Sequence, residues 1–352
     1  MPHVVLTGYR LDPRLLALTR AVQLAGHTYQ LHLLSPGINS SDLDEMECVK
    51  RLNHGSDIVC TWSKDGEPPP ASADLAVLAV HGTFSPEQRA QMLRFVSRIK
   101  RRQILYREQT SLLRFQLGQW VKELKSPLLA SSSLPIWLED GRLPLLSFLL
   151  RKNFDYMGIF PHPMYLASRD LLSQLNVKKK YDSEYLLGYA GSWNALRAPL
   201  IKWMEPQLTP IAGGAFGEHT FGAEKRPVYW VNDSADSKRV RLPGEYLEAL
   251  SRSQFTLCPA GYIGYTHRVL ETLCRGGVPV FPGETQPYYK LPLVHLKNCI
   301  LVQNGDWATA VHTILNLSPE EVEKMRANVN ELTKGEADPE KILIRMAKEM
   351  FE

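Results

Sequence analysis

The stretch QFTLCPAGYIGYTHRVLETLCRGGVPVF, residues 254–281, decides the fold of this chain. It begins with the apolar run QFTLC and ends with the apolar run VPVF, and both are typical of buried strands. Between them, a loop rich in glycine and tyrosine leads into the helix pattern YTHRVLETLCRG. A strand, a glycine-rich loop, a helix and a second strand together predict a β-α-β unit with a parallel sheet.

The helix in this stretch carries an arginine and a carboxylate on one face. Arg268 and Glu271 are three residues apart, which places them on the same side of a helix. Arg268 can clamp a diphosphate through two parallel hydrogen bonds, and Glu271 can accept hydrogen bonds from two ribose hydroxyls. A solvated surface ion pair is the plainer interpretation. The apolar neighbours Val269 and Leu270 and the strand that follows at once favour a binding site.

A second stretch, YLLGYAGSWNALRAPLIKWM at 185–204, repeats the arrangement. A strand runs into a turn that contains Gly191 and Ser192, and a helix follows. Glycine lets the backbone approach a ligand closely, and the start of a helix presents N–H groups to an anion. Arg197 lies about one turn further on. One such turn is common in any α/β protein, but two of them, each with an arginine, suit a nucleoside diphosphate.

Strands and helices alternate along the whole chain. The alternation opens with the strand HVVLTG, a helix that Asp12 can cap and Gly26 ends, and the strand TYQLHLL. The polar segment 176–185 interrupts it and is the expected linker. The pattern predicts an α/β fold with two Rossmann-like, doubly wound domains that face each other across a cleft, with ligands at the carboxyl ends of the strands. The expected boundaries are 1–178, 179–335 and a C-terminal helix, 336–352, that packs back on the first domain.

The composition excludes several classes of protein. Apolar residues make up 44% and charged residues 22%, as in soluble globular proteins, and no apolar run approaches a membrane span. No signal peptide is apparent, and the five cysteines form no CxxC pair, which predicts free thiols in a reducing compartment. No metal-binding motif stands out; DLD at 42–44 is better explained as a helix cap. We therefore expect a cytoplasmic monomer that contacts no membrane and holds no metal.

The two loop-helix stretches resemble a known group of enzymes. GSWNALR and YTHRVLETLCRGGVPVF are similar to the donor-binding half of GT-B glycosyltransferases. The second stretch also resembles the exostosin family. The order of elements, together with RVLET at 268–272, is similar to the DNA β-glucosyltransferases of T-even phages.

The resemblance implies an inverting glycosyltransferase that uses a UDP-sugar donor. It needs no cofactor, because cationic side chains neutralise the leaving group, and a divalent metal would be stimulatory at most. Glu271 is expected to bind the ribose. The other expected donor-binding residues are Gly191, Ser192, Arg197, Thr266, His267 and Arg268.

The resemblance also implies a general base. Glu108 follows the predicted strand QILYR, at the place where the phage family has a catalytic aspartate. A general base takes the proton of the acceptor hydroxyl. A glutamate in the first turn of a helix can equally serve to complement the helix dipole. Asp12 and His81 are the alternative bases.

The acceptor stays open between two classes. The net charge is +4, and basic runs occur as RIKRR at 98–102 and KKK at 178–180, which fit a solvated surface or a polyanionic partner. The phage resemblance implies hydroxymethylcytosine in double-stranded DNA, with Arg101 and Arg102 as DNA contacts near the mouth of the cleft. The chain would then be a bacteriophage protein acting in the host cytoplasm. The exostosin resemblance implies a glycan or glycolipid acceptor, and an inert sugar-nucleotide-binding protein is a third hypothesis.

Overall fold

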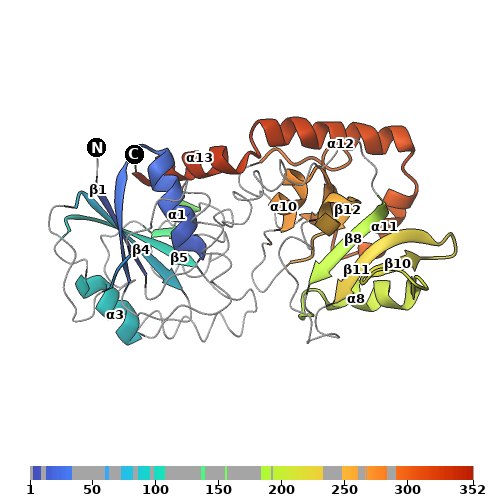
Figure 1. Cartoon of the computed structure of the whole chain (residues 1–352), viewed down its shortest axis with the longest axis horizontal. Helices are drawn as coiled ribbons and strands as arrows, with labels where there is room; N and C mark the ends of the chain where they lie inside the picture. Colours follow the sequence, from blue (N-terminus) through green and yellow to red (C-terminus); the bar gives the residue numbers. More distant parts are fainter. Residues whose placement is uncertain are drawn as a thin grey trace. The chain divides into compact units, whose positions relative to one another are not determined.

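The computed structural model divides the chain into two units (Figure 1). Unit 1 comprises Met1–Asp170 with Pro339–Glu352, and unit 2 comprises Leu171–Asp338. The structure describes residues 3–8, 13–33, 60–62, 73–81, 86–95, 99–107, 136–138, 155–156, 184–191, 193–232, 248–260, 266, 268–283 and 291–351.

Unit 1 is built on a parallel sheet with the strand order β3-β2-β1-β4-β5-β6-β7. Its strands are β1 (His3–Gly8), β2 (Thr28–Leu33), β3 (Cys60–Trp62), β4 (Leu75–His81), β5 (Arg101–Arg107), β6 (Ile136–Leu138) and β7 (Asp155–Tyr156). The central strands are continuous apolar runs because helices cover both faces of a parallel sheet. Val5, Leu6 and Leu78 are accordingly fully buried.

Two of the helices described in unit 1 follow its strands in the chain, and a third comes from the C-terminus. Helix α1 (Pro13–Leu24) follows β1, and α3 (Pro86–Phe95) follows β4. Helix α13 (Pro339–Phe351) packs against α1, beside which it lies in Figure 1. Arg20 Nη2 donates to Glu340 Oε1 at 2.7 Å across this contact, and Leu343 of α13 is fully buried. The end of the chain is therefore part of the unit that contains its beginning.

Unit 2 is built on a mixed sheet with the strand order β14-β13-β12-β8-β11-β10-β9. Its strands are β8 (Tyr185–Gly191), β9 (Leu208–Pro210), β10 (Glu218–Phe221), β11 (Arg226–Asn232), β12 (Ser253–Leu257), β13 (Val278–Pro282) and β14 (Ile300–Val302). Strand β10 is antiparallel to both of its neighbours, and the other pairs are parallel. The predicted linker, 176–185, reaches too far, because Tyr185 is the buried first residue of β8.

Among the residues of unit 2 that the structure describes, the α-helices are short except for the last. They are α8 (Ala198–Met204), α10 (Arg268–Cys274), α11 (Trp307–Leu315) and α12 (Pro319–Lys334). Helix α10 contacts β13 and buries Val269, Leu270 and Leu273. Full burial of each such side chain contributes about 1.5–3 kcal/mol. This packing fixes α10, and with it the position of Arg268.

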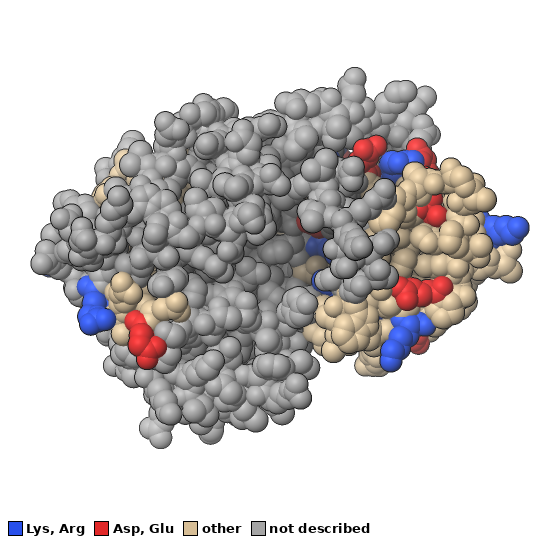
Figure 2. Space-filling view, turned by 60° about the horizontal axis from the view of Figure 1, so that its bottom comes forward, with Lys and Arg blue, Asp and Glu red and all other residues tan. Residues whose placement is uncertain are grey.

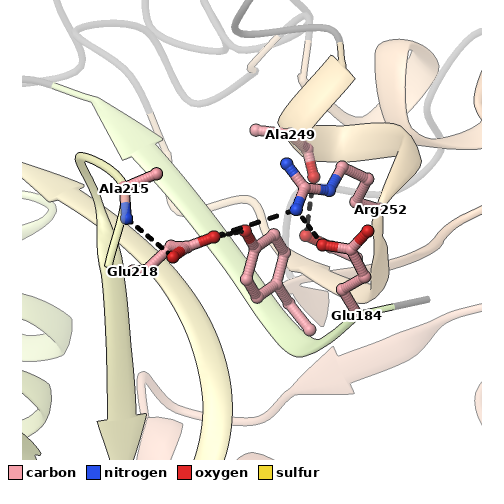
Figure 3. Close-up of polar contacts among 7 residues, drawn as sticks. Glu184, Ala215, Glu218, Ala249 and Arg252 are labelled. Carbon is pink, nitrogen blue, oxygen red and sulfur yellow. Dashed lines mark hydrogen bonds and ion pairs between the residues drawn. The ribbon is translucent and has the colours of Figure 1, made fainter. Parts of the chain in front are cut away.

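A polar cluster ties the antiparallel edge of this sheet to its centre (Figure 3). Glu218 of β10 accepts a 2.5 Å hydrogen bond from Tyr185 Oη and a 2.8 Å hydrogen bond from the Ala215 backbone N–H. Arg252 lies 3.8 Å from the same carboxylate and pairs with Glu184. The hydrogen bond from Tyr185 is the main cause that lowers the pKa of Glu218, while burial and this bond raise the pKa of Tyr185. Glu218 therefore acts as an ionised anchor for the hairpin that β9 and β10 form.

Candidate functional site

Two buried arginines meet at the last residue of β8. A Cβ placed on Gly191 would lie 2.9 Å from Arg268 Nη2 and 3.0 Å from Arg197 Nη1. The hydroxyl of Tyr189 would be 3.2 Å away. Any side chain at position 191 would therefore displace both guanidinium groups, so glycine is required here for space.

Arg268 is held in place by the strand that it faces. Its Nη2 donates a hydrogen bond to the carbonyl oxygen of Ala190, and its Cζ lies 5.5 Å from the centroid of the Tyr189 ring. That ring in turn stacks on Trp230 of β11 with centroids 4.3 Å apart. At the start of α10, the Arg268 backbone N–H donates to Thr266 Oγ1 at 3.4 Å. The guanidinium is thus oriented by β8, while Thr266 holds the backbone of Arg268 at the start of the helix.

Arg197 approaches Gly191 from the turn before α8. Its Nε donates to the carbonyl oxygen of Ala260 at 3.2 Å, which connects this turn to the loop after β12. The Arg197 backbone N–H donates to Asn194 Oδ1 at 2.9 Å. Arg197 is 9% exposed and Arg268 is 8% exposed. Arg197 therefore reaches Gly191 from the turn before α8 and Arg268 reaches it from the start of α10, and neither extends freely into water.

This geometry suits a phosphate-bearing ligand. Arginine presents planar N–H donors that match phosphate oxygens, and burial strengthens such contacts because water screens them less. Gly191 ends β8, so the two guanidinium groups lie at the carboxyl edge of a parallel strand pair, where ligands of doubly wound sheets bind. Two cations at one glycine can neutralise a diphosphate.

Glu271 lies one turn after Arg268 on α10 and is half-buried. Its negative charge contributes to raising the pKa of the Cys258 thiol, although burial is the main cause and takes that pKa to about 12. Cys258 is therefore a protonated core thiol and not a nucleophile. Glu271 is the acidic residue in the first turn of α10, the turn that Arg268 begins.

The other predicted site residues are described only in part. Ser192, His267, Glu108 and the alternative base Asp12 lie outside the described residues. His81 is the last residue of β4, and its side chain is not described. In sequence, Glu108 directly follows Arg107, the last residue of β5, so the candidate base comes at the carboxyl end of a parallel strand.

The two predicted DNA-contacting residues lie at the amino end of a strand. Arg101 and Arg102 begin β5, whereas Glu108 follows its carboxyl end. At about 3.3 Å per residue, the two ends are roughly 20 Å apart. The role of Arg101 and Arg102 as DNA contacts therefore stays a prediction, with the length of β5 between them and the residue that precedes Glu108. Figure 2 shows Lys and Arg side chains interspersed with Asp and Glu among the described residues of the face drawn, and no continuous basic stripe there.

Within the described ranges, no group of three or more His, Cys, Asp or Glu side chains could hold a metal ion. No helix in the same ranges is long and apolar enough to span a membrane.

Several contributors to the site had not been predicted. Tyr189 supports Arg268 with its ring, Asn194 holds the turn at Arg197, and the carbonyl groups of Ala190 and Ala260 accept from the guanidinium groups. Asn194 carries a sequence signal, since asparagine side chains commonly accept hydrogen bonds from backbone N–H groups two and three residues further on in a turn. The two carbonyl acceptors carry none, because any residue type offers the same group.

No protein-family model matches the chain, and no curated protein matches it either. Solved structures do match it over its whole length. HepE from Anabaena, in complex with UDP and glucose, aligns with a TM-score of 0.59 at 10% identity and covers 99% of this chain and 98% of its own. TarM from S. aureus, in complex with fondaparinux, alpha-GlcNAc-glycerol and UDP, aligns with a TM-score of 0.60 at 9% identity. This match covers 99% of this chain and 100% of the TarM chain.

A third match is sucrose-phosphate synthase from Thermosynechococcus elongatus, with a TM-score of 0.53 at 13% identity, over 99% of this chain and 98% of that one. At these identities, the likeness concerns the fold. The predicted fold class is confirmed: the chain has the GT-B fold, with two Rossmann-like units in series.

Proposed function

We propose that this chain is an inverting glycosyltransferase that transfers a sugar from a UDP-sugar to a hydroxyl group. The observation that carries the proposal is the convergence of Arg197 and Arg268 on Gly191 at the carboxyl edge of β8. The GT-B fold supports it, as do the UDP and the glucose in the HepE complex.

In this proposal the donor diphosphate lies against Gly191 between the two guanidinium groups. As the bond between sugar C1 and the phosphate oxygen breaks, negative charge grows on the departing UDP. The guanidinium groups stabilise that charge because they are already oriented by Ala190 and Ala260. Glu271 binds the ribose hydroxyls, and Ser192, Thr266 and His267 complete the donor site.

Glu108 is the proposed general base. It takes the proton of the acceptor hydroxyl while the acceptor oxygen attacks C1 from the face opposite to UDP, which inverts the configuration at C1. Its place directly after β5 supports the assignment, because a parallel sheet gathers functional groups at the carboxyl ends of its strands. Asp12 and His81 are the bases to be tested next.

A carbohydrate hydroxyl is the acceptor that we favour. TarM was crystallised with alpha-GlcNAc-glycerol and fondaparinux, and HepE with glucose, so proteins of this fold handle sugar ligands. Hydroxymethylcytosine in DNA is the second candidate, and the order of elements together with the RVLET stretch supports it. The placement of Arg101 and Arg102 at the amino end of β5 adds no support for DNA near the base.

A transfer assay tests both the proposed activity and the proposed class of acceptor. The full chain is incubated with radiolabelled UDP-glucose and, separately, with soluble oligosaccharides, hydroxymethylcytosine DNA and plain DNA. Label in an oligosaccharide supports the favoured acceptor, and label in hydroxymethylcytosine DNA alone supports the second. If neither UDP-glucose nor UDP-N-acetylglucosamine gives transfer above an Arg268→Ala control, the chain is no glycosyltransferase of this kind.

A further inference from the structure

The turn that presents Arg197 is organised by one buried asparagine. Asn194 is 6% exposed, and its Oδ1 accepts hydrogen bonds from the backbone N–H groups of Leu196 and Arg197, both at 2.9 Å. Its own carbonyl oxygen accepts from the N–H groups of Arg197 and Ala198 at 3.1 and 3.0 Å. Four hydrogen bonds from three successive residues therefore converge on Asn194.

These contacts fix where the Arg197 side chain begins. Arg197 Nη1 lies where a side chain of residue 191 would begin, and its Nε donates to Ala260, so the guanidinium is placed against two separate segments from one backbone position. A shift of the turn would move the guanidinium away from at least one of them. Misplacement of a binding group by an ångström is enough to lose much of its effect.

We infer that Asn194 is a positioning residue of the donor site, which acts through Arg197 on the binding of the UDP diphosphate. The inference rests on the proposed function, since it assigns Arg197 to the diphosphate. Among the described residues, no acceptor contacts Asn194 Nδ2, so the contacts use this side chain as an acceptor only. A serine hydroxyl can supply the same acceptor to a helix start, whereas alanine cannot.

The test is a double-mutant cycle on UDP binding, measured by titration calorimetry with the full chain. Asn194→Ala should weaken UDP binding roughly five- to ten-fold. Loss of such a side-chain acceptor costs about 1 kcal/mol, and we expect this free energy to appear as weaker binding because the disordered turn carries Arg197. Asn194→Ser should recover most of the affinity. In an Arg197→Ala background, Asn194→Ala should have almost no further effect, because the residue through which it acts is gone.

The double-mutant cycle distinguishes a wrong donor site from a wrong role of Asn194. If Arg197→Ala leaves UDP affinity unchanged, the donor site itself is wrong. If Arg197→Ala weakens binding but Asn194→Ala does not, or if the two effects simply multiply, Asn194 has no positioning role. Asn194→Gly replaces the alanine variant if that variant does not fold, since glycine is tolerated at helix starts but offers no side-chain acceptor.

Discussion

Substitution of Gly191 by alanine should abolish most of the affinity for UDP without unfolding the chain. The new methyl group would lie 2.9 Å from Arg268 Nη2 and 3.0 Å from Arg197 Nη1. Real carbon contacts of this kind are rarely closer than about 3.4 Å, so each guanidinium must retreat by roughly half an ångström. Both groups are the ends of long side chains and can move, which is why the fold should survive.

The expected size of the effect follows from the hydrogen bonds that this retreat disturbs. A hydrogen bond to a charged group contributes about 1.5–3 kcal/mol. Loss of the equivalent of one such bond between the arginines and the diphosphate weakens UDP binding roughly 10- to 150-fold. The melting temperature should fall little, because the three atoms nearest to the new methyl group, Arg268 Nη2, Arg197 Nη1 and Tyr189 Oη, are all at the ends of side chains.

The assay is calorimetric titration of UDP, with Gly283→Ala as the matched control. Gly283 follows β13 of the same sheet, and a Cβ there would meet only the end of the Gln303 side chain, at 3.3 Å, and a Leu301 carbon at 3.6 Å. The control should bind UDP like the wild type. Unchanged affinity in the folded Gly191→Ala variant would refute the reasoning, because two displaced guanidinium groups could not then be the diphosphate ligands.

Three further perturbations test other parts of the account. Glu271→Ala should weaken UDP binding by about 1.5–3 kcal/mol, since two ribose hydroxyls lose a charged acceptor. Equal calorimetric affinities of the wild type for UDP and deoxy-UDP would count against this role of Glu271. Glu108→Gln should keep donor affinity but lower transfer about 10²- to 10⁴-fold, and wild-type turnover would move the role to Asp12 or His81. The lowered pKa of Glu218 means that its stabilising effect is complete above the ordinary glutamate pKa and is lost as pH falls through the folded value. Denaturant titrations should therefore show a smaller loss of stability below about pH 4.3 for Glu218→Gln than for the wild type, and identical pH profiles would contradict the anchor role.

The alternation of strands and helices was predictable because it depends on burial. Strands such as β1, β4, β8 and β12 are covered on both sides and appear in the sequence as continuous apolar runs. The antiparallel extension was not predicted. Strand β9 has three residues and ends in a proline, and most residues of β10 are only partly buried, so neither shows a hydrophobic period.

The candidate site was predictable in its arginines but not in its supports. Arg197 and Arg268 both follow strands that end in glycine-rich loops, and neighbouring parallel strands bring such loops together. The groups that hold the arginines are a tyrosine ring and backbone carbonyls, whose positions depend on tertiary packing. The prediction for Arg101 and Arg102 stays untested; the structure adds that both begin β5, so a whole extended strand separates them from the residue that precedes Glu108.

A crystal structure of the chain with UDP tests the central claim most directly. The account predicts that the diphosphate lies against Gly191, with phosphate oxygens about 2.7–3.2 Å from nitrogen atoms of both Arg197 and Arg268. A diphosphate bound elsewhere in the chain, or no bound UDP at saturating concentration, would contradict it.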